Sequence, residues 1–176
     1  MRQISTLLLV LVLACTSVQA RVVKGKVTSG NEKLSGVIVT DGENFTKTSR
    51  NGSFRLDIDD DAKFVFIVTP SGYAADWSTG VPQFYQKAQG KDYFVFDLVN
   101  LGKETSTYHI LAVGDPQPRK EKHSEIFAGE PLEDLCSTAA SLKEMTVGVV
   151  AGDLCFDVFP LLDNWKRDIV RTGIPF

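Results

Sequence analysis

The chain has 176 residues, of which 43% are hydrophobic and 23% are charged, values ordinary for a folded protein. They exclude wholesale disorder, and the length allows one domain or two small ones. The formal net charge of −3 gives no basic surface of the kind that binds nucleic acid, so no nucleic-acid partner is indicated.

The first 20 residues are typical of an export signal. Arg2 supplies a short positive start, and residues 7–14 form an apolar run. This run is too short to cross a bilayer, which takes about 20 residues. Because residues 18–20 fit a small-residue cleavage site, we expect cleavage after Ala20 and a location in the periplasm or at the cell surface. Cleavage before Cys15, which would leave a lipid anchor, is the alternative.

Residues 21–99 have the pattern of short β-strands separated by turns. Apolar residues alternate with polar ones, and Asp41-Gly42 and Asn51-Gly52 are strong hairpin-turn signals. We therefore expect an antiparallel β-sandwich. The expected strands are residues 22–28, 36–40, 45–48, 53–58, 64–68 and 93–99.

Three stretches of this region carry a resemblance: Val23-Lys24-Gly25-Lys26-Val27, residues 34–39, and Asn51-Gly52-Ser53-Phe54. They resemble the carboxypeptidase-regulatory-like domain, which implies an Ig-like (immunoglobulin-type) fold. Such domains accompany many functions, so the resemblance does not define the chemistry.

Residues 73–91 are the least regular part of the chain and carry several aromatic side chains among Gly, Pro and Gln. We favour a long connection whose aromatic side chains cover the end of the sandwich. The alternative is an exposed aromatic surface that contacts a cell-surface glycan or another component of the envelope.

After a polar linker at residues 100–107, the hydrophobic period changes. Apolar runs predict strands, and a spacing of three and four residues predicts helices. We expect a βαβα order, in which the first βαβ unit brings its two strands side by side and parallel. The expected elements are a strand at 108–113, a charged loop at 116–129, a helix at 131–142, a strand at 147–151 and a helix at 158–170.

Both expected parallel strands end in Gly-Asp. The first is followed by Gly114-Asp115-Pro116-Gln117 and the second by Gly152-Asp153. Ligands of open α/β sheets gather at the carboxyl ends of the strands. We therefore expect the carboxylates of Asp115 and Asp153 to meet at one edge of the sheet, as in a metal site.

These two blocks resemble the calcineurin-like metallophosphoesterases, more narrowly a Bacteroides-type, exported branch with an N-terminal domain. The resemblance implies a phosphate mono- or diester as substrate and two divalent ions of the Mn, Fe or Zn class. If the ligand positions of that family apply to this sequence, Asp115 and Gln117 would bind the first ion, and Asp153 would bridge both ions. Gln117 stands where most members have His. Asp157 is interpreted as a helix N-cap or as a group that supports the ligands.

The resemblance also implies ligand blocks that do not occur in these 176 residues. His109 is expected to pack within its strand and His123 to lie in a solvated loop, so neither fills a ligand position. The chain is thus expected to consist of an Ig-like sandwich followed by the N-terminal part of an α/β metallophosphoesterase domain. It is expected to have no substantial turnover alone. Efficient aryl-phosphate hydrolysis abolished by Asp153→Ala would contradict this.

Cys136 and Cys155 are expected to be buried free thiols. Residues 21–99 are expected to fold well and residues 108–176 to be loosely held, because a two-stranded parallel sheet buries little.

Two alternatives to catalysis stay open: a binding module without an active site, and aspartates that serve only as turn and cap residues.

Overall fold

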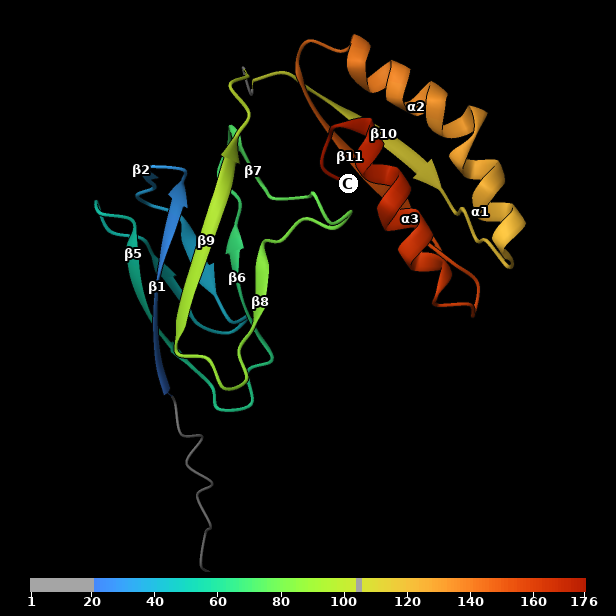
Figure 1. Ribbon diagram of the computed structural model, residues 1–176. Coiled ribbons are helices and arrows are strands. Elements are labelled where there is room, and N and C mark those ends of the chain that lie inside the picture. Colours follow the sequence, from blue (N-terminus) through green and yellow to red (C-terminus); the bar gives the residue numbers. More distant parts are fainter. Residues whose placement is uncertain (1–20, 104–105) are drawn as a thin grey trace, which may run out of the picture.

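The computed structural model describes residues 21–103 and 106–176, which form a β-rich part followed by an α/β part (Figure 1). The expected signal segment, residues 1–20, and its Cys15 lie outside the described residues. Among the residues that are described, no helix is long and apolar enough to cross a membrane.

The β-rich part consists of two sheets. The five-stranded sheet has the order β2-β1-β9-β7, with β5 also pairing with β1. Its strands are β1 (Arg21–Ser29), β2 (Glu32–Lys33), β5 (Ser53–Ile58), β7 (Tyr73–Ala75) and β9 (Tyr93–Asn100). The four-stranded sheet has the order β4-β3-β6-β8. Its strands are β3 (Ile38–Thr40), β4 (Phe45–Lys47), β6 (Phe64–Val68) and β8 (Tyr85–Lys87).

A single hydrophobic core lies between the two sheets. Successive side chains of a strand point to opposite faces, and in β1 and β9 alternate residues are buried. Val23 and Phe94 of the first sheet and Val39 and Val65 of the second are all 0% exposed and belong to one cluster. The two sheets therefore pack on either side of one core, as expected of a β-sandwich.

Two details of the sandwich differ from the expectation. The pairing is not antiparallel throughout, because β1 and β9 run parallel, with Val27 opposite Phe96. The region expected to be irregular, residues 73–91, contributes the edge strands β7 and β8. Each has only three residues, too few to show a period of two.

The α/β part begins with a parallel pair of strands, as expected, whose register runs from Tyr108 opposite Met145 to Gly114 opposite Ala151. Its elements are β10 (Tyr108–Gly114), α1 (Glu121–Ala128), α2 (Glu130–Ser141), β11 (Met145–Ala151), α3 (Leu161–Ile169) and the 3₁₀ helix η1 (Val170–Thr172). Gly173 follows η1 with φ of 71°, the left-handed conformation expected of the glycine that ends a helix.

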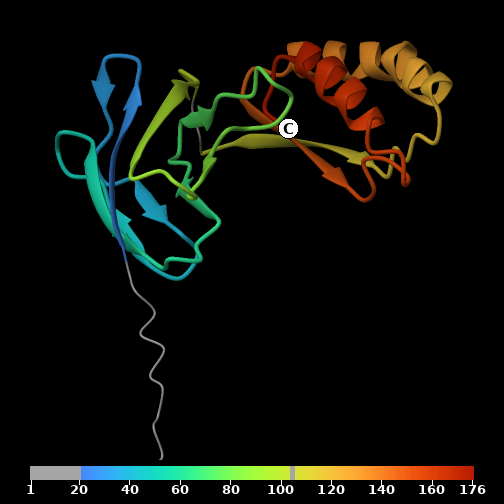
Figure 2. The same ribbon diagram turned by 60° about the horizontal axis from the view of Figure 1, so that its bottom comes forward.

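The helices cover one face of this two-stranded sheet (Figure 2). The centre of the small core is formed by Leu132, Trp165 and Ile169, against which Val113 and Val150 of the strands pack. On the opposite face, the side chains of Tyr108, Ile110 and Val149 are 59%, 54% and 42% exposed. This part therefore buries far less than the sandwich.

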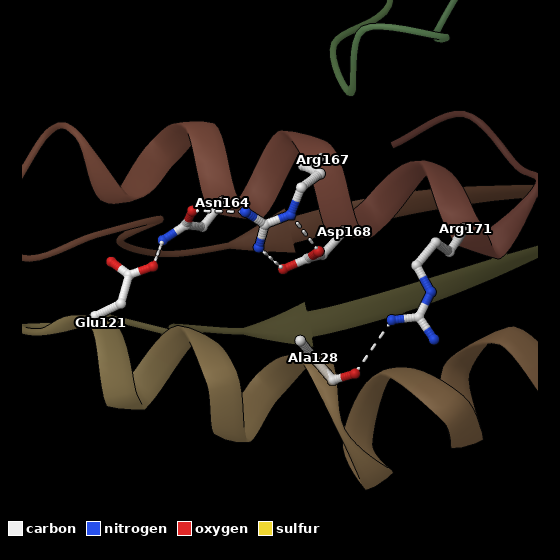
Figure 3. A network of polar contacts seen from close by, with 6 residues as sticks. All are labelled: Glu121, Ala128, Asn164, Arg167, Asp168 and Arg171. Atoms are coloured by element: carbon white, nitrogen blue, oxygen red, sulfur yellow. Dashed lines mark hydrogen bonds and ion pairs between the residues drawn. The ribbon is translucent and has the colours of Figure 1, made fainter.

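Helix α1 occupies a segment that was expected to be a charged loop. Its charged residues face solvent, whereas Ser124 is buried and Phe127 stacks on Trp165 with ring centroids 4.7 Å apart. A polar network joins α1 to α3, in which the Asn164 amide donates to the Glu121 carboxylate at 2.8 Å (Figure 3). The segment becomes helical because it has α3 to pack against.

The loop between β7 and β8 extends from the sandwich to α3 and the C-terminal end of the chain (Figures 1 and 2). Gly80 is buried in this loop, and a Cβ on it would lie 2.3 Å from the carbonyl oxygen of Lys166. Val81, beside Gly80, lines a groove together with Leu162 and Phe176. The two parts of the chain thus meet through backbone contact at Gly80.

Candidate functional site

The candidate site lies where β10 and β11 end. Because these strands are parallel and in register, the residues that follow them reach the same edge of the sheet. Two backbone hydrogen bonds continue the pairing beyond the strands: Asp115 N–H to Ala151 O at 3.2 Å, and Gln117 N–H to Asp153 O at 3.1 Å. The predicted meeting of Asp115 and Asp153 is therefore present.

The side chains of Asp115 and Gln117 also bond to Asp153. The Asp115 carboxylate accepts, through Oδ1, the N–H of Asp153 at 2.8 Å. The Gln117 amide donates from Nε2 to Oδ2 of Asp153 at 2.6 Å. Asp115 and Asp153 are exposed and Gln117 is half-buried. Asp115 and Gln117 thus both bond to Asp153, the first to its backbone N–H and the second to its carboxylate, and both aspartates are exposed to solvent.

The backbone at this edge adopts conformations that L residues rarely take. Asp115 has φ of 31° and Gln117 has φ of 34°, and they are the only non-glycine residues with positive φ among those described. Gly152 has φ of 121°, and a Cβ there would lie 2.9 Å from Asp115 Oδ1. Such strain costs on the order of 1–3 kcal/mol per residue and clusters at functional sites.

The donor atoms suit a hard or borderline divalent ion. Two carboxylates and the oxygen of an amide are the kinds of ligand that such ions take. Within the described ranges, no group of three or more His, Cys, Asp or Glu residues is placed to hold a metal. The three side chains therefore fit one portion of a metal site rather than a closed coordination shell.

The two histidines lie outside this group, as expected, although their surroundings differ from the expectation. The His109 side chain is 40% exposed rather than packed in its strand, and its Nε2 lies 3.2 Å from a carboxylate oxygen of Glu144. His123 lies on α1, half-buried, and its Nδ1 accepts the N–H of Arg119 at 3.4 Å. The expectation that His123 lies in a solvated loop is therefore wrong.

Two other expectations on single residues have clear outcomes. Asp157 does not cap α3, because the helix begins at Leu161 and Pro160 is in the N-cap position. A supporting role for Asp157 stays a prediction. Cys136 and Cys155 are free thiols, but half-buried rather than buried.

One contact near the site was not foreseen. The guanidinium carbon of Arg119 lies 4.3 Å from the centroid of the Phe156 ring. Arg119 follows Gln117 by two residues, and Phe156 follows Asp153 by three. Nothing in the local sequence pattern pairs an exposed Arg with an exposed Phe 37 positions on, so only the fold identifies this contact.

Comparison with protein families gives a match to the first part of the chain. Residues 21–100 match the family model described as the N terminal of calcineurin-like phosphoesterase. The matched segment ends where β9 ends, at Asn100, and so corresponds to the β-rich part of the chain. No curated protein and no solved structure matches the chain. The match supports the calcineurin-like phosphoesterase family and rests on the β-rich part of the chain.

Proposed function

We propose that the chain belongs to an exported, metal-dependent phosphoesterase, and that its α/β part is the beginning of the catalytic domain. The substrate would be a phosphate mono- or diester. The single observation that carries the proposal is the hydrogen-bonded group of Asp115, Gln117 and Asp153 at the carboxyl edge of a parallel strand pair. The family match of the preceding part supports it independently.

In this proposal, Asp115 and Asp153 bind divalent ions through the carboxylate oxygens that face solvent. Asp115 also positions Asp153, because its Oδ1 accepts the Asp153 N–H. Gln117 orients the other carboxylate through its Nε2 donor. A half-turn of the Gln117 amide would present its oxygen as a further ligand. When bound, divalent ions polarise the phosphate and make a water molecule more acidic.

The proposal is tested by titrating the chain with Mn²⁺ and following the free-ion signal by electron paramagnetic resonance. Asp153→Asn keeps the shape of the side chain and removes its charge, so we expect at least about tenfold weaker binding. Asp134→Asn is the matched control, because Asp134 is exposed on α2 and lies outside the site. Equal affinity of wild type and Asp153→Asn would refute the metal site.

A second candidate function is a binding module, and one feature of the sandwich favours it. The outer face of β4 and β6 is apolar, with Phe45, Phe64 and Val68 being 66%, 38% and 52% exposed. The ring centroids of Tyr85 and Phe64 lie 5.5 Å apart, with the rings edge-on to each other. Exposed aromatic surfaces of this kind mark interaction sites, here for a cell-surface glycan or an envelope protein.

A glycan array probed with the whole chain separates this candidate from the first. Binding that is lost in Phe64→Ser, without loss of Mn²⁺ affinity, would support a binding surface on the sandwich. The absence of any bound glycan would weaken the glycan-binding form of the candidate and would leave the metal site unaffected.

A further inference from the structure

The loops after β10 and β11 are joined a second time, beyond the carboxylates. The Phe156 N–H donates to the Pro118 carbonyl oxygen at 3.3 Å. Directly beside this bond, the Arg119 guanidinium lies over the Phe156 ring at 4.3 Å. Gln117 bonds to Asp153 one step earlier along the same two loops, so Arg119 and the carboxylates belong to one pair of joined loops.

The Arg119 side chain is held in place without using its hydrogen-bond donors. Among the described residues, its guanidinium makes no hydrogen bond or ion pair, although the exposed carboxylate of Asp157 follows Phe156 directly. A guanidinium that lies over an aromatic ring is attracted through its charge, so the contact uses none of its N–H donors. The ring therefore favours this position of the cation while its donors stay available to a ligand.

An oxyanion that approaches this edge needs such a cation. Asp115, Asp153 and Asp157 are all exposed and concentrate negative charge at the ends of the two loops. Ions bound to Asp115 and Asp153 would offset part of this charge, and Arg119 is the first fixed cation of the chain after Gln117. Arg binds phosphate with two parallel hydrogen bonds, which a Lys cannot reproduce.

We propose that Arg119 is a substrate-recognition residue that binds two terminal oxygens of a phosphate monoester. The inference rests on the proposed function and deepens it by naming the substrate class. A monoester carries a second negative charge and a third terminal oxygen that a diester lacks. Arg119 can therefore engage two oxygens of a monoester and leave one to face Asp115 and Asp153 with their ions.

The test is a titration of the whole chain, in saturating Mg²⁺, with inorganic phosphate and with dimethyl phosphate as the diester probe. The side-chain N–H of Arg119 is followed by ¹H–¹⁵N NMR and assigned by its loss in Arg119→Gln. We expect phosphate to shift this signal and to bind about tenfold or more weakly to Arg119→Gln. Dimethyl phosphate should bind more weakly than phosphate and lose less affinity in this variant.

Two further variants make the result specific. Arg119→Lys keeps the charge and loses the planar pair of donors, so phosphate affinity should lie between wild type and Arg119→Gln. Lys122→Gln removes an exposed cation three residues away on α1 and should leave the affinity unchanged. Equal losses in Arg119→Gln and Lys122→Gln would reduce the effect to general charge and overturn the proposal, as would an Arg119 signal that phosphate does not move.

A failure of the proposed function can be distinguished from a failure of the role given to Arg119. If Mn²⁺ affinity does not depend on Asp153, the metal site is wrong, while the comparison of Arg119→Gln with Lys122→Gln still decides whether Arg119 binds phosphate. If Mn²⁺ affinity depends on Asp153 but phosphate affinity does not depend on Arg119, the phosphoesterase proposal stands and the role given to Arg119 is refuted.

Discussion

Replacing Gly80 by Ala tests whether the sandwich holds the α/β part in place. Gly80 has φ of +83°, and the added Cβ would lie 2.3 to 2.6 Å from the O, Cα and Cβ atoms of Lys166. Two of these atoms belong to the backbone and the third is fixed to it, so no change of rotamer relieves the overlap. The loop must move away from α3, and Val81 then loses its contacts in the groove at Leu162 and Phe176.

Gly90→Ala is a matched control for the conformational cost. Gly90 has φ of +67°, and a Cβ there would meet nothing within 4 Å. Both variants place an L residue in the left-handed region, at about 1–2 kcal/mol. Only Gly80→Ala adds the cost of overpacking, about 1–3 kcal/mol. We therefore expect Gly80→Ala to be the less stable variant by about 1–3 kcal/mol.

The assay combines urea unfolding with limited proteolysis. In wild type, we expect cleavage within residues 106–176 before cleavage within 21–103, because the sandwich has the larger core. Gly80→Ala should accelerate cleavage of the second part and leave the first unchanged, whereas Gly90→Ala should not. Equal unfolding midpoints and equal cleavage rates for the two variants would show that the loop does not hold the α/β part.

Three other predictions concern the α/β part. Leu132→Ala, at a 0% exposed position, should destabilise it by about 2–5 kcal/mol in urea unfolding, and a smaller loss would mean that its core is not specifically packed. Arg167→Met should lower the urea midpoint more than Arg167→Met combined with Asp168→Asn, because Asp168 is 6% exposed and pairs with Arg167 at 2.9 Å. Hydrogen bonds from its own backbone N–H and from His109 lower the pKa of Glu144 below its ordinary value, so ionised Glu144 stabilises the fold above that ordinary pKa and the contribution disappears as the pH falls through the lowered pKa. Midpoints of wild type and Glu144→Gln should therefore converge in acid, and a constant difference would contradict this origin.

Hydrophobic periodicity, a local property, was sufficient to predict most of the secondary structure. The alternation along β5, the continuous apolar run of β6 and the helical spacing in α2 each arise within a few residues, so they are visible without knowledge of partners. The same reasoning placed Asp115 and Asp153 together, because a βαβ unit leaves little freedom in how its strands pair.

What the sequence alone did not predict depends on contacts between distant segments. The parallel pairing of β1 with β9 joins residues about 70 positions apart, and β7 and β8 are too short to show a period. Helix α1 forms against α3 although its own composition resembles a charged loop. Each of these outcomes was decided by packing that no local pattern encodes.

The same distinction between local pattern and tertiary contact holds for the candidate site. Residue types and the spacing of two Gly-Asp blocks were enough to predict that carboxylates meet at a sheet edge. Only the tertiary structure revealed the positive φ of Asp115 and Gln117, the close approach of Gly152, and the cation–π contact of Arg119 with Phe156. The physical reason is that the strain and the cation–π contact arise where two loops meet, and neither loop contains that information alone.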